Sequence, residues 1–324
     1  RIDHVDGLND PAGYIRLLRN NFPELYLIIE KILVPGEELP VSWPVQGTTG
    51  YDFLNHVNGV FVDRMNGRAI SKIYSKFSGF RSNFNEMARN KKRLIILELM
   101  AGDINNLAQE LKSISSRDRH ASDVTLYGLR RALTEVLVSF PVYRSYISWT
   151  EFTESDRKYL ETAINQAEQY EPALASELHF IRKFLLLQFP PYIAEAGKTE
   201  WTKFAMRFQQ YTSPVMAKGL EDTVLYIFNR LISLNDVGGQ TEIFGHSIKE
   251  FHHLNKKRFL LTPLSLNATT THDTKRDEDV RARINVLSEI PQEWETTVKR
   301  WARLNRLRKK RIGRIYFPDN NDEY

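Results

Sequence analysis

Residues 1–30 read RIDHVDGLNDPAGYIRLLRNNFPELYLIIE, and this stretch decides the predicted fold. A short polar segment over residues 1–6 leads through a turn to Pro11, and proline is favoured at the first position of a helix. Apolar residues then recur at helical spacing until Pro23 ends the helix. Residues 25–30 form a nearly continuous apolar run, which is typical of a parallel strand buried on both faces. Strand end, helix and strand together predict one βαβ unit.

The rest of the chain alternates between loop-like and helical composition. Residues 35–55 are rich in proline and glycine and predict a loop. From about residue 80 to 210 the pattern is helical, and because this block is too long for one crossover, we expect a helical insertion. A return to the sheet is predicted over residues 260–271, where β-branched and apolar residues lead into His272 and Asp273.

The amino-acid composition excludes several classes of protein. Of 324 residues, 42% are hydrophobic and 26% are charged, as in ordinary globular proteins. The sequence contains no apolar run of about eighteen residues, so no membrane-spanning helix is predicted. The absence of cysteine excludes a disulfide scaffold, cysteine-ligated zinc and thiol catalysis. The start lacks an initiator methionine and a signal-peptide pattern, so we expect the interior of a longer, cytoplasmic protein without a membrane partner.

Much of the excess positive charge lies in one stretch, residues 299–314. A basic run of this kind can follow a phosphate backbone. The favoured interpretation is a solvated helix face, because apolar residues recur at helical spacing beneath the charges: Trp301, Leu304, Leu307 and Ile312. No nucleic-acid partner is therefore expected.

Three carboxylates stand at predicted strand ends: Asp3, Glu30 and Asp273. In a parallel barrel the carboxyl ends of all strands face one mouth, where catalytic groups gather. Carboxylates placed there can perform glycosidic chemistry as nucleophile, general acid/base and support for the cationic transition state. Arg1 lies two residues before Asp3, on the same side of a strand, where it would keep that carboxylate ionised.

Each acid also has a purely structural interpretation. Arg1 and Asp3 can form a surface ion pair, Glu30 can be a solvated strand end, and Asp273 can cap a helix. Other chemistries lack their motifs, since the sequence has neither phosphate loop nor G-x-S-x-G. Adjacent histidines at 252 and 253 diverge, and H-E-x-x-H is missing, so no metal and no cofactor are expected.

The first eight residues, RIDHVDGL, resemble the motif at the fourth strand of the α-amylase superfamily, glycoside hydrolase family 13. Longer motifs extend the resemblance toward the branch of this family that isomerises α-1,4-glucans. They are IEKIL (29–33), GEELP (36–40), GTTGYDF (47–53), VMAKGLED (215–222), THDTKR (271–276) and EDVRAR (278–283).

This resemblance implies an α/β fold, namely part of a (β/α)8 TIM barrel from the fourth strand onward with a large helical insertion. Residues 1–80 would hold strands four and five with a substrate loop, and residues 81–205 the mostly helical insertion. Residues 206–324 would supply the remaining barrel strands and helices. The N-terminal barrel strands and a C-terminal β domain would be absent from this chain. The remaining segments of the same polypeptide are therefore expected partners.

The resemblance also implies roles for single residues. Asp3 resembles the family nucleophile, Glu30 the general acid/base and Asp273 the transition-state stabiliser, with Asp222 as a rival for the third acid. The residues expected to bind substrate are Arg1, His4, Tyr51, Asp52, Lys218, Glu221, His272, Lys275 and Arg276.

The implied reaction is a retaining intramolecular transglycosylation. It would convert the reducing-end α-1,4 link of a maltooligosaccharide, or of a starch-derived α-1,4-glucan, to an α,α-1,1 link and so form a maltooligosyl trehalose. The alternative is an α-glucan hydrolase of the same superfamily, and the extent of water access separates the two. A catalytically inactive carbohydrate-binding protein is disfavoured because all three acids are intact. The implied pathway partner is maltooligosyl trehalose trehalohydrolase, which releases trehalose.

Overall fold

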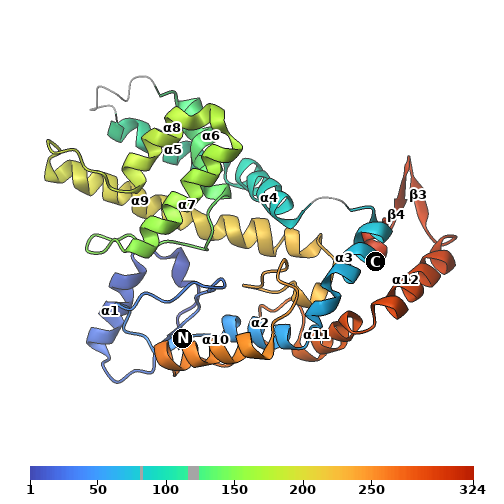
Figure 1. Cartoon of the computed structure of the whole chain (residues 1–324). Helices are drawn as coiled ribbons and strands as arrows, with labels where there is room; N and C mark the ends of the chain where they lie inside the picture. Colours follow the sequence, from blue (N-terminus) through green and yellow to red (C-terminus); the bar gives the residue numbers. More distant parts are fainter. Residues whose placement is uncertain (81–82, 116–123) are drawn as a thin grey trace. The chain divides into compact units, whose positions relative to one another are not determined.

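A computed structural model describes residues 1–80, 83–115 and 124–324, and most of these residues are helical (Figure 1). The chain divides into two compact units. Unit 1 comprises Arg1–Leu33, Glu37–Val45 and Ala88–Asp222, and unit 2 comprises Val34–Gly36, Gln46–Met87 and Thr223–Tyr324.

In its described residues, unit 1 holds the short strand β1 (Ile28–Ile29) and a set of long helices. The helices are α1 (Pro11–Asn21), α4 (Phe84–Leu99, whose first turn belongs to unit 2), α5 (Ala101–Ser115), α6 (Leu126–Val138), α7 (Glu154–Tyr170), α8 (Ala175–Leu185) and α9 (Glu195–Met216). Short helical turns are η1 (Val5–Gly7), η4 (Pro172–Leu174) and η5 (Ala217–Glu221).

The predicted βαβ unit is confirmed at the start of unit 1. Ile2 forms a parallel bridge with Ile29 on the far side of α1. The helix begins at Pro11, with the Asp10 side chain accepting from the N–H of Gly13 at 2.9 Å, and it ends at Asn21, ahead of Pro23. The strand is shorter than the predicted run over residues 25–30, because only its last part is paired and buried.

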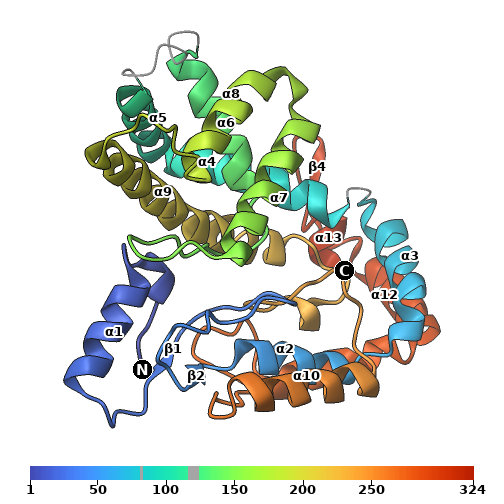
Figure 2. The same cartoon turned by 60° about the vertical axis from the view of Figure 1, so that its left-hand side comes forward.

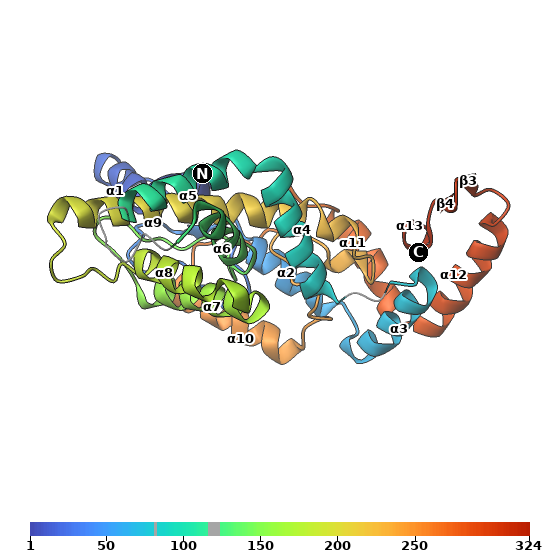
Figure 3. The same ribbon diagram turned by 90° about the horizontal axis from the view of Figure 1, so that it is seen from above.

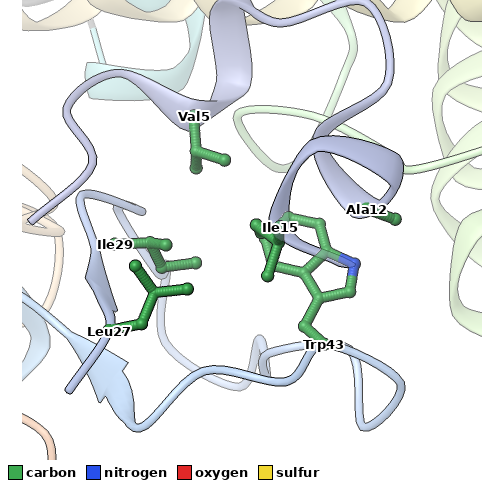
Figure 4. Packing of buried hydrophobic residues seen from close by; sticks show 6 residues of the cluster. All are labelled: Val5, Ala12, Ile15, Leu27, Ile29 and Trp43. Atoms are coloured by element: carbon green, nitrogen blue, oxygen red, sulfur yellow. The ribbon is translucent and has the colours of Figure 1, made fainter. Parts of the chain in front are cut away.

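A small hydrophobic core fixes this βαβ unit (Figure 4). Ala12 and Ile15 from α1 pack in one cluster with Leu27 and Ile29, and Val5 of η1 and Trp43 belong to the same cluster. Ile15, Ile29 and Val5 are fully buried. The cluster therefore fixes α1 against the chain segments on either side of it, and burial of each such side chain contributes about 1.5–3 kcal/mol.

The helical block of unit 1 is organised around α9, the longest helix (Figure 3). Helices α5, α6 and α8 pack against α9, and α9 also contacts η1. Phe204 and Phe208 of α9 are fully buried, and Gln210 donates through its side chain to the carbonyl of Gly7 at 3.1 Å. The block thereby supports the turn that follows the first candidate acid.

The described residues of unit 2 form helices, short turns and three short strands. The helices are α2 (Tyr51–Val60), α3 (Gly67–Ser78), α10 (Ile248–Leu261), α11 (Glu278–Asn285), α12 (Pro291–Asn305) and α13 (Asn320–Glu323). The turns are η2 (Arg64–Asn66), η6 (Val224–Tyr226), η7 (Ile232–Leu234) and η8 (Val286–Ser288), and the strands are β2 (Gly47–Thr48), β3 (Lys310–Ile312) and β4 (Ile315–Phe317). Helix α10 packs against α2 (Figure 2), α12 and α13 pack against α3, and β3 pairs with β4 in an antiparallel hairpin.

The predicted strand over residues 260–271 is wrong. A capping box of Ser247 and Glu250 starts α10, and the helix continues through Leu261. Pro263 then disfavours helical backbone at Thr262, and an irregular segment follows. One sheet-like bond remains in this segment, from the N–H of Leu266 to the carbonyl of Thr48 at 3.1 Å.

The solvated helix face predicted over residues 299–314 is confirmed only as far as Asn305, and the rest of that prediction is wrong. The buried seam of α12 runs through Trp294 and Val298, and the helix ends at Asn305. The chain then turns into the β3–β4 hairpin around Gly313, which has a φ of 62°. The apolar residues expected beneath the charges are instead exposed: Trp301, Leu304, Leu307 and Ile312. In the described ranges, no helix is both long and apolar enough to cross a membrane.

The close approach of Gly50 to the segment after α10 generates a stability prediction. Gly50 has a φ of 92°, and a Cβ at this position would lie 2.2 Å from the carbonyl oxygen of Leu266. Gly79 has a φ of 74° and no heavy atom within 4 Å of its Cβ position. We expect Gly79→Ala to cost about 1–2 kcal/mol, from backbone strain alone. Gly50→Ala carries the same strain and a backbone clash, so we expect about 3 kcal/mol or more. Urea denaturation of both variants measures the difference, and equal losses would show that the clash is relieved.

Candidate active site

Asp3 and Arg1 lie together at the start of unit 1, on either side of the paired residue Ile2. The Nε and Nη2 atoms of Arg1 lie 2.7 and 2.6 Å from Oδ1 of Asp3. The Asp3 side chain is 66% exposed, so this pair adds little to stability. The guanidinium nevertheless places a positive charge directly on the carboxylate predicted to be the nucleophile.

Glu30 forms hydrogen bonds with this N-terminal segment through both its main chain and its side chain. Its N–H donates to the carbonyl of Ile2 at 2.8 Å, which continues the parallel pairing. Its Oε2 accepts from the N–H of His4 at 2.6 Å. The βαβ unit therefore brings Glu30 to the residue that follows Asp3. A carboxylate that accepts a backbone N–H is held in one orientation.

His4 adopts a left-handed backbone conformation, with φ 45° and ψ 49°. Such strain in a residue other than glycine costs about 1–3 kcal/mol and is concentrated at functional sites. Here the conformation directs the N–H of His4 at Glu30. Gly7 makes room for the imidazole, since a Cβ at position 7 would lie 2.4 Å from Cδ2 of His4.

Lys218, Glu221 and Asp222 lie at the end of α9, in and just after η5, which is a π-helical turn. Turns of this kind are frequent at functional sites. The Nζ of Lys218 lies 2.7 Å from Oδ2 of Asp222, and both side chains are partly exposed. Glu221 accepts a hydrogen bond from the hydroxyl of Tyr143. Asp222, the rival third acid, thus has a local cationic partner.

Asp273 lies in unit 2 and contacts two residues that the sequence also singles out. Its Oδ2 is 3.1 Å from Nε2 of His272 and accepts from the buried Tyr51 hydroxyl at 3.5 Å. Thr271 joins them, because its hydroxyl donates to the Tyr51 oxygen at 3.1 Å and accepts from the Asp273 N–H at 3.2 Å. The alternative role of Asp273 as a helix cap is wrong, since Asp277 caps α11.

The other predicted substrate-binding residues of unit 2 have partners within the same unit. The carboxylate of Asp52 pairs with Arg258 of α10 and accepts from the Thr48 hydroxyl at 3.3 Å. The ammonium of Lys275 lies 5.2 Å from the ring centre of Tyr226. Arg276 donates to the carbonyl of Ile232 at 3.3 Å.

Sequence analysis missed a buried ion pair behind this loop. Oδ2 of Asp236 lies 3.4 Å from Nη1 of Arg281, and both side chains are almost completely buried. Asp236 also accepts from the N–H of Lys275 at 3.2 Å, and Arg281 donates to the carbonyl of Thr269. The pair therefore holds the loop that carries Asp273 on both sides. Arg281 lies within a quoted motif, but its partner stands 45 positions away, and no local pattern connects them.

Burial raises the pKa of Asp236, and the N–H of Val237 and the charge of Arg281 oppose this rise. In the described part of the chain, no cluster of three or more His, Asp or Glu side chains is arranged to hold a metal ion. The candidate catalytic groups of the two units are carboxylates held by hydrogen bonds and ion pairs.

Comparison with known proteins places the chain among trehalose-forming synthases. No family model matches the chain. Two curated Mycobacterium tuberculosis proteins, provisionally named maltooligosyl trehalose synthase, are each 32% identical over 295 residues, covering 91% of this chain. The solved maltooligosyltrehalose synthase of Arthrobacter ramosus superposes with a TM-score of 0.81 at 32% identity, over 94% of this chain and 36% of that one. The solved glycosyltrehalose synthase of strain DSM5389 superposes with a TM-score of 0.75 at 37% identity, over 100% of this chain and 36% of that one.

The chain is a homologue of the maltooligosyl trehalose synthases. It spans 35% of the length of the curated synthases that it matches. A third solved structure, described as a hypothetical maltooligosyl trehalose synthase of Sulfolobus tokodaii, matches all of this chain with a TM-score of 0.76 at 35% identity. The similarity to these synthases thus covers both units, including every motif quoted above.

The buried Asp236–Arg281 pair predicts a pH-dependent loss of stability. Because the pKa of Asp236 is raised in the folded state, the fold favours the protonated form of this acid. The stability gained from this preference is fully present below the unfolded pKa of about 3.9 and is lost as the pH rises through the folded pKa. Arg281→Met removes a charge that opposes this rise. We expect a loss of about 3 kcal/mol at pH 7 that shrinks as the pH falls toward 4. The exposed Arg283, on the same helix, provides the control Arg283→Met. Denaturation curves at several pH values test this, and a deficit independent of pH would contradict it.

Proposed function

We propose that this chain carries the catalytic acids of a retaining intramolecular transglycosylase that forms maltooligosyl trehalose from maltooligosaccharides. The observation that carries the proposal is the hydrogen bond of 2.6 Å from the N–H of His4 to Glu30, beside Asp3 with its guanidinium partner. Similarity to the synthases over 91% of the chain supports the substrate class.

In the proposed reaction, Glu30 donates its proton to the oxygen of the reducing-end α-1,4 link. Asp3 attacks the anomeric carbon, the C–O bond breaks, and a covalent glycosyl-enzyme forms. The released glucose stays bound, turns, and presents its own C1 hydroxyl to the intermediate. Glu30 takes the proton of that hydroxyl while the new α,α-1,1 bond forms and the bond to Asp3 breaks.

Asp273 is the proposed stabiliser of the positive charge that develops on the sugar ring in both steps. The Tyr51 hydroxyl and the His272 imidazole at its Oδ2 support this role, because they fix the carboxylate without burying it. The proposed substrate-binding set remains Arg1, His4, Tyr51, Asp52, Lys218, Glu221, His272, Lys275 and Arg276.

The proposed fold is a (β/α)8 barrel entered at its fourth strand, with the helical insertion over residues 81–205. The parallel bridge between Ile2 and Ile29 across α1 supports it, because this is the repeating connection of such a barrel. Segments outside this chain would complete the barrel in the same polypeptide. A maltooligosyl trehalose trehalohydrolase is the proposed consumer of the product.

The test follows the full-length polypeptide with maltohexaose as substrate, by reducing-end assay and anomeric proton NMR. We expect reducing ends to disappear while a 1,1-linked anomeric signal grows. We expect Glu30→Gln to lower kcat on the order of 10²- to 10⁴-fold, because it removes general acid/base catalysis. Glu24→Gln, an exposed carboxyl of the same segment, is the matched control and should retain activity.

A rise in reducing ends would instead mean that water reaches the intermediate, and the α-glucan hydrolase would replace the transglycosylase. An unchanged substrate with folded protein would overturn both functions.

A further inference from the structure

Lys31 directly follows Glu30 and is completely buried, which is unusual for a lysine. Its ammonium lies 2.9 Å from Oε1 of Glu37 and 3.5 Å from Oδ2 of Asp6. It also donates to the carbonyl of Ile32 at 2.8 Å. Burial lowers the pKa of Lys31, but the two carboxylates outweigh burial and hold the pKa above its ordinary value. The side chain is therefore a cation at neutral pH.

Asp6 is the second member of this buried cluster, three residues after Asp3. Its Oδ1 accepts a hydrogen bond from the hydroxyl of Tyr146. The fully buried Arg144 donates to the carbonyl of Asp6 and, at 3.1 Å, to that of Asn9. Asp6 and Glu37 thus supply two negative charges beside the two cations, Lys31 and Arg144.

The cluster also reaches the segment at the end of α9. The ammonium of Lys31 lies 5.5 Å from the ring centre of Tyr143 and 5.7 Å from that of Tyr146. The hydroxyl of the same Tyr143 donates to Glu221 in η5. Lys31 is thus linked to three of the motif segments that the sequence singles out, around Asp6, Glu37 and Glu221.

We propose that Lys31 is a positioning residue, which fixes the carboxylate of Glu30 relative to Asp3 by clamping the segments that carry them. Lys31 directly follows Glu30 in the chain, and its partner Asp6 lies in the turn η1, just after Asp3. The clamp therefore acts on the contact between the His4 N–H and Glu30. A buried ion pair is weak evidence for stability, because desolvation offsets the attraction, so a structural need alone does not explain it. This inference rests on the proposed transglycosylase.

The experiment compares a single and a double variant of the full-length polypeptide. Lys31→Met removes the ammonium and leaves Asp6 and Glu37 in excess. Lys31→Met/Glu37→Gln also lacks the clamp, but it restores the charge balance of the buried cluster. Each variant is assayed for kcat and KM on maltohexaose, for thermal stability, and for hydrogen exchange at the His4 amide.

If Lys31 positions Glu30, the double variant recovers stability but keeps a kcat on the order of 10- to 100-fold below the parent, with KM little changed. Its His4 amide exchanges faster, because Glu30 no longer accepts from it. Recovery of both kcat and His4 protection in the double variant would overturn the inference, because charge balance would then be the whole role of Lys31.

Two further variants and one further readout keep the outcomes separate. Arg89→Met disturbs another buried ion pair of unit 1, with Glu135, and should cost stability without changing kcat. If neither Lys31 variant folds, Tyr146→Phe removes only the hydroxyl bonded to Asp6, and parent-like kcat and His4 exchange would overturn the inference. If the parent does not act on maltohexaose, the proposed function fails, and His4 exchange in the double variant still decides the role of Lys31.

Discussion

The parallel pairing of Ile2 with Ile29 is the interaction on which the candidate site of unit 1 depends. Two main-chain bonds define it, from Ile2 to Ile28 at 3.0 Å and from Glu30 to Ile2 at 2.8 Å. This pairing sets the register of two segments that α1 separates, and a slip of one residue would turn Glu30 to the opposite face. The cluster that includes Ile15, Ile29 and Trp43 holds the register. The position of the acid is thus a consequence of packing on the far side of the strand.

Local sequence chemistry was sufficient to predict this unit. Pro11 and Pro23 bound the helix, and the apolar run places the next strand, so each signal lies within a few residues of what it determines. The segment over residues 260–271 was mispredicted because its β-branched composition favours a strand, while the capping box at Ser247 had already committed the preceding residues to α10.

Buried ion pairs were beyond prediction for a different reason. Asp236 and Arg281 are 45 positions apart, and Asp6 and Lys31 are 25 apart, so no periodicity connects them. In sequence, each of these residues is indistinguishable from a solvated charge. The motifs that carry the family resemblance contain Asp6, Lys31 and Arg281, yet a motif identifies a residue without saying what it contacts. Their partners follow only from the tertiary structure.

In both units, an exposed candidate acid lies near a chain segment that a buried ion pair anchors. Asp3 and Asp273, the proposed catalytic acids, are 66% and 51% exposed, so burial does not fix either carboxylate. In each unit the neighbouring chain is instead anchored by a buried ion pair, Lys31 with Asp6 in unit 1 and Arg281 with Asp236 in unit 2. Such pairs are geometrically demanding, because a buried charge tolerates little displacement from its partner. An apolar anchor of similar volume would stabilise the fold as well, but it would position the acids less strictly. We propose that the buried charges supply the precision that the proposed catalytic acids require.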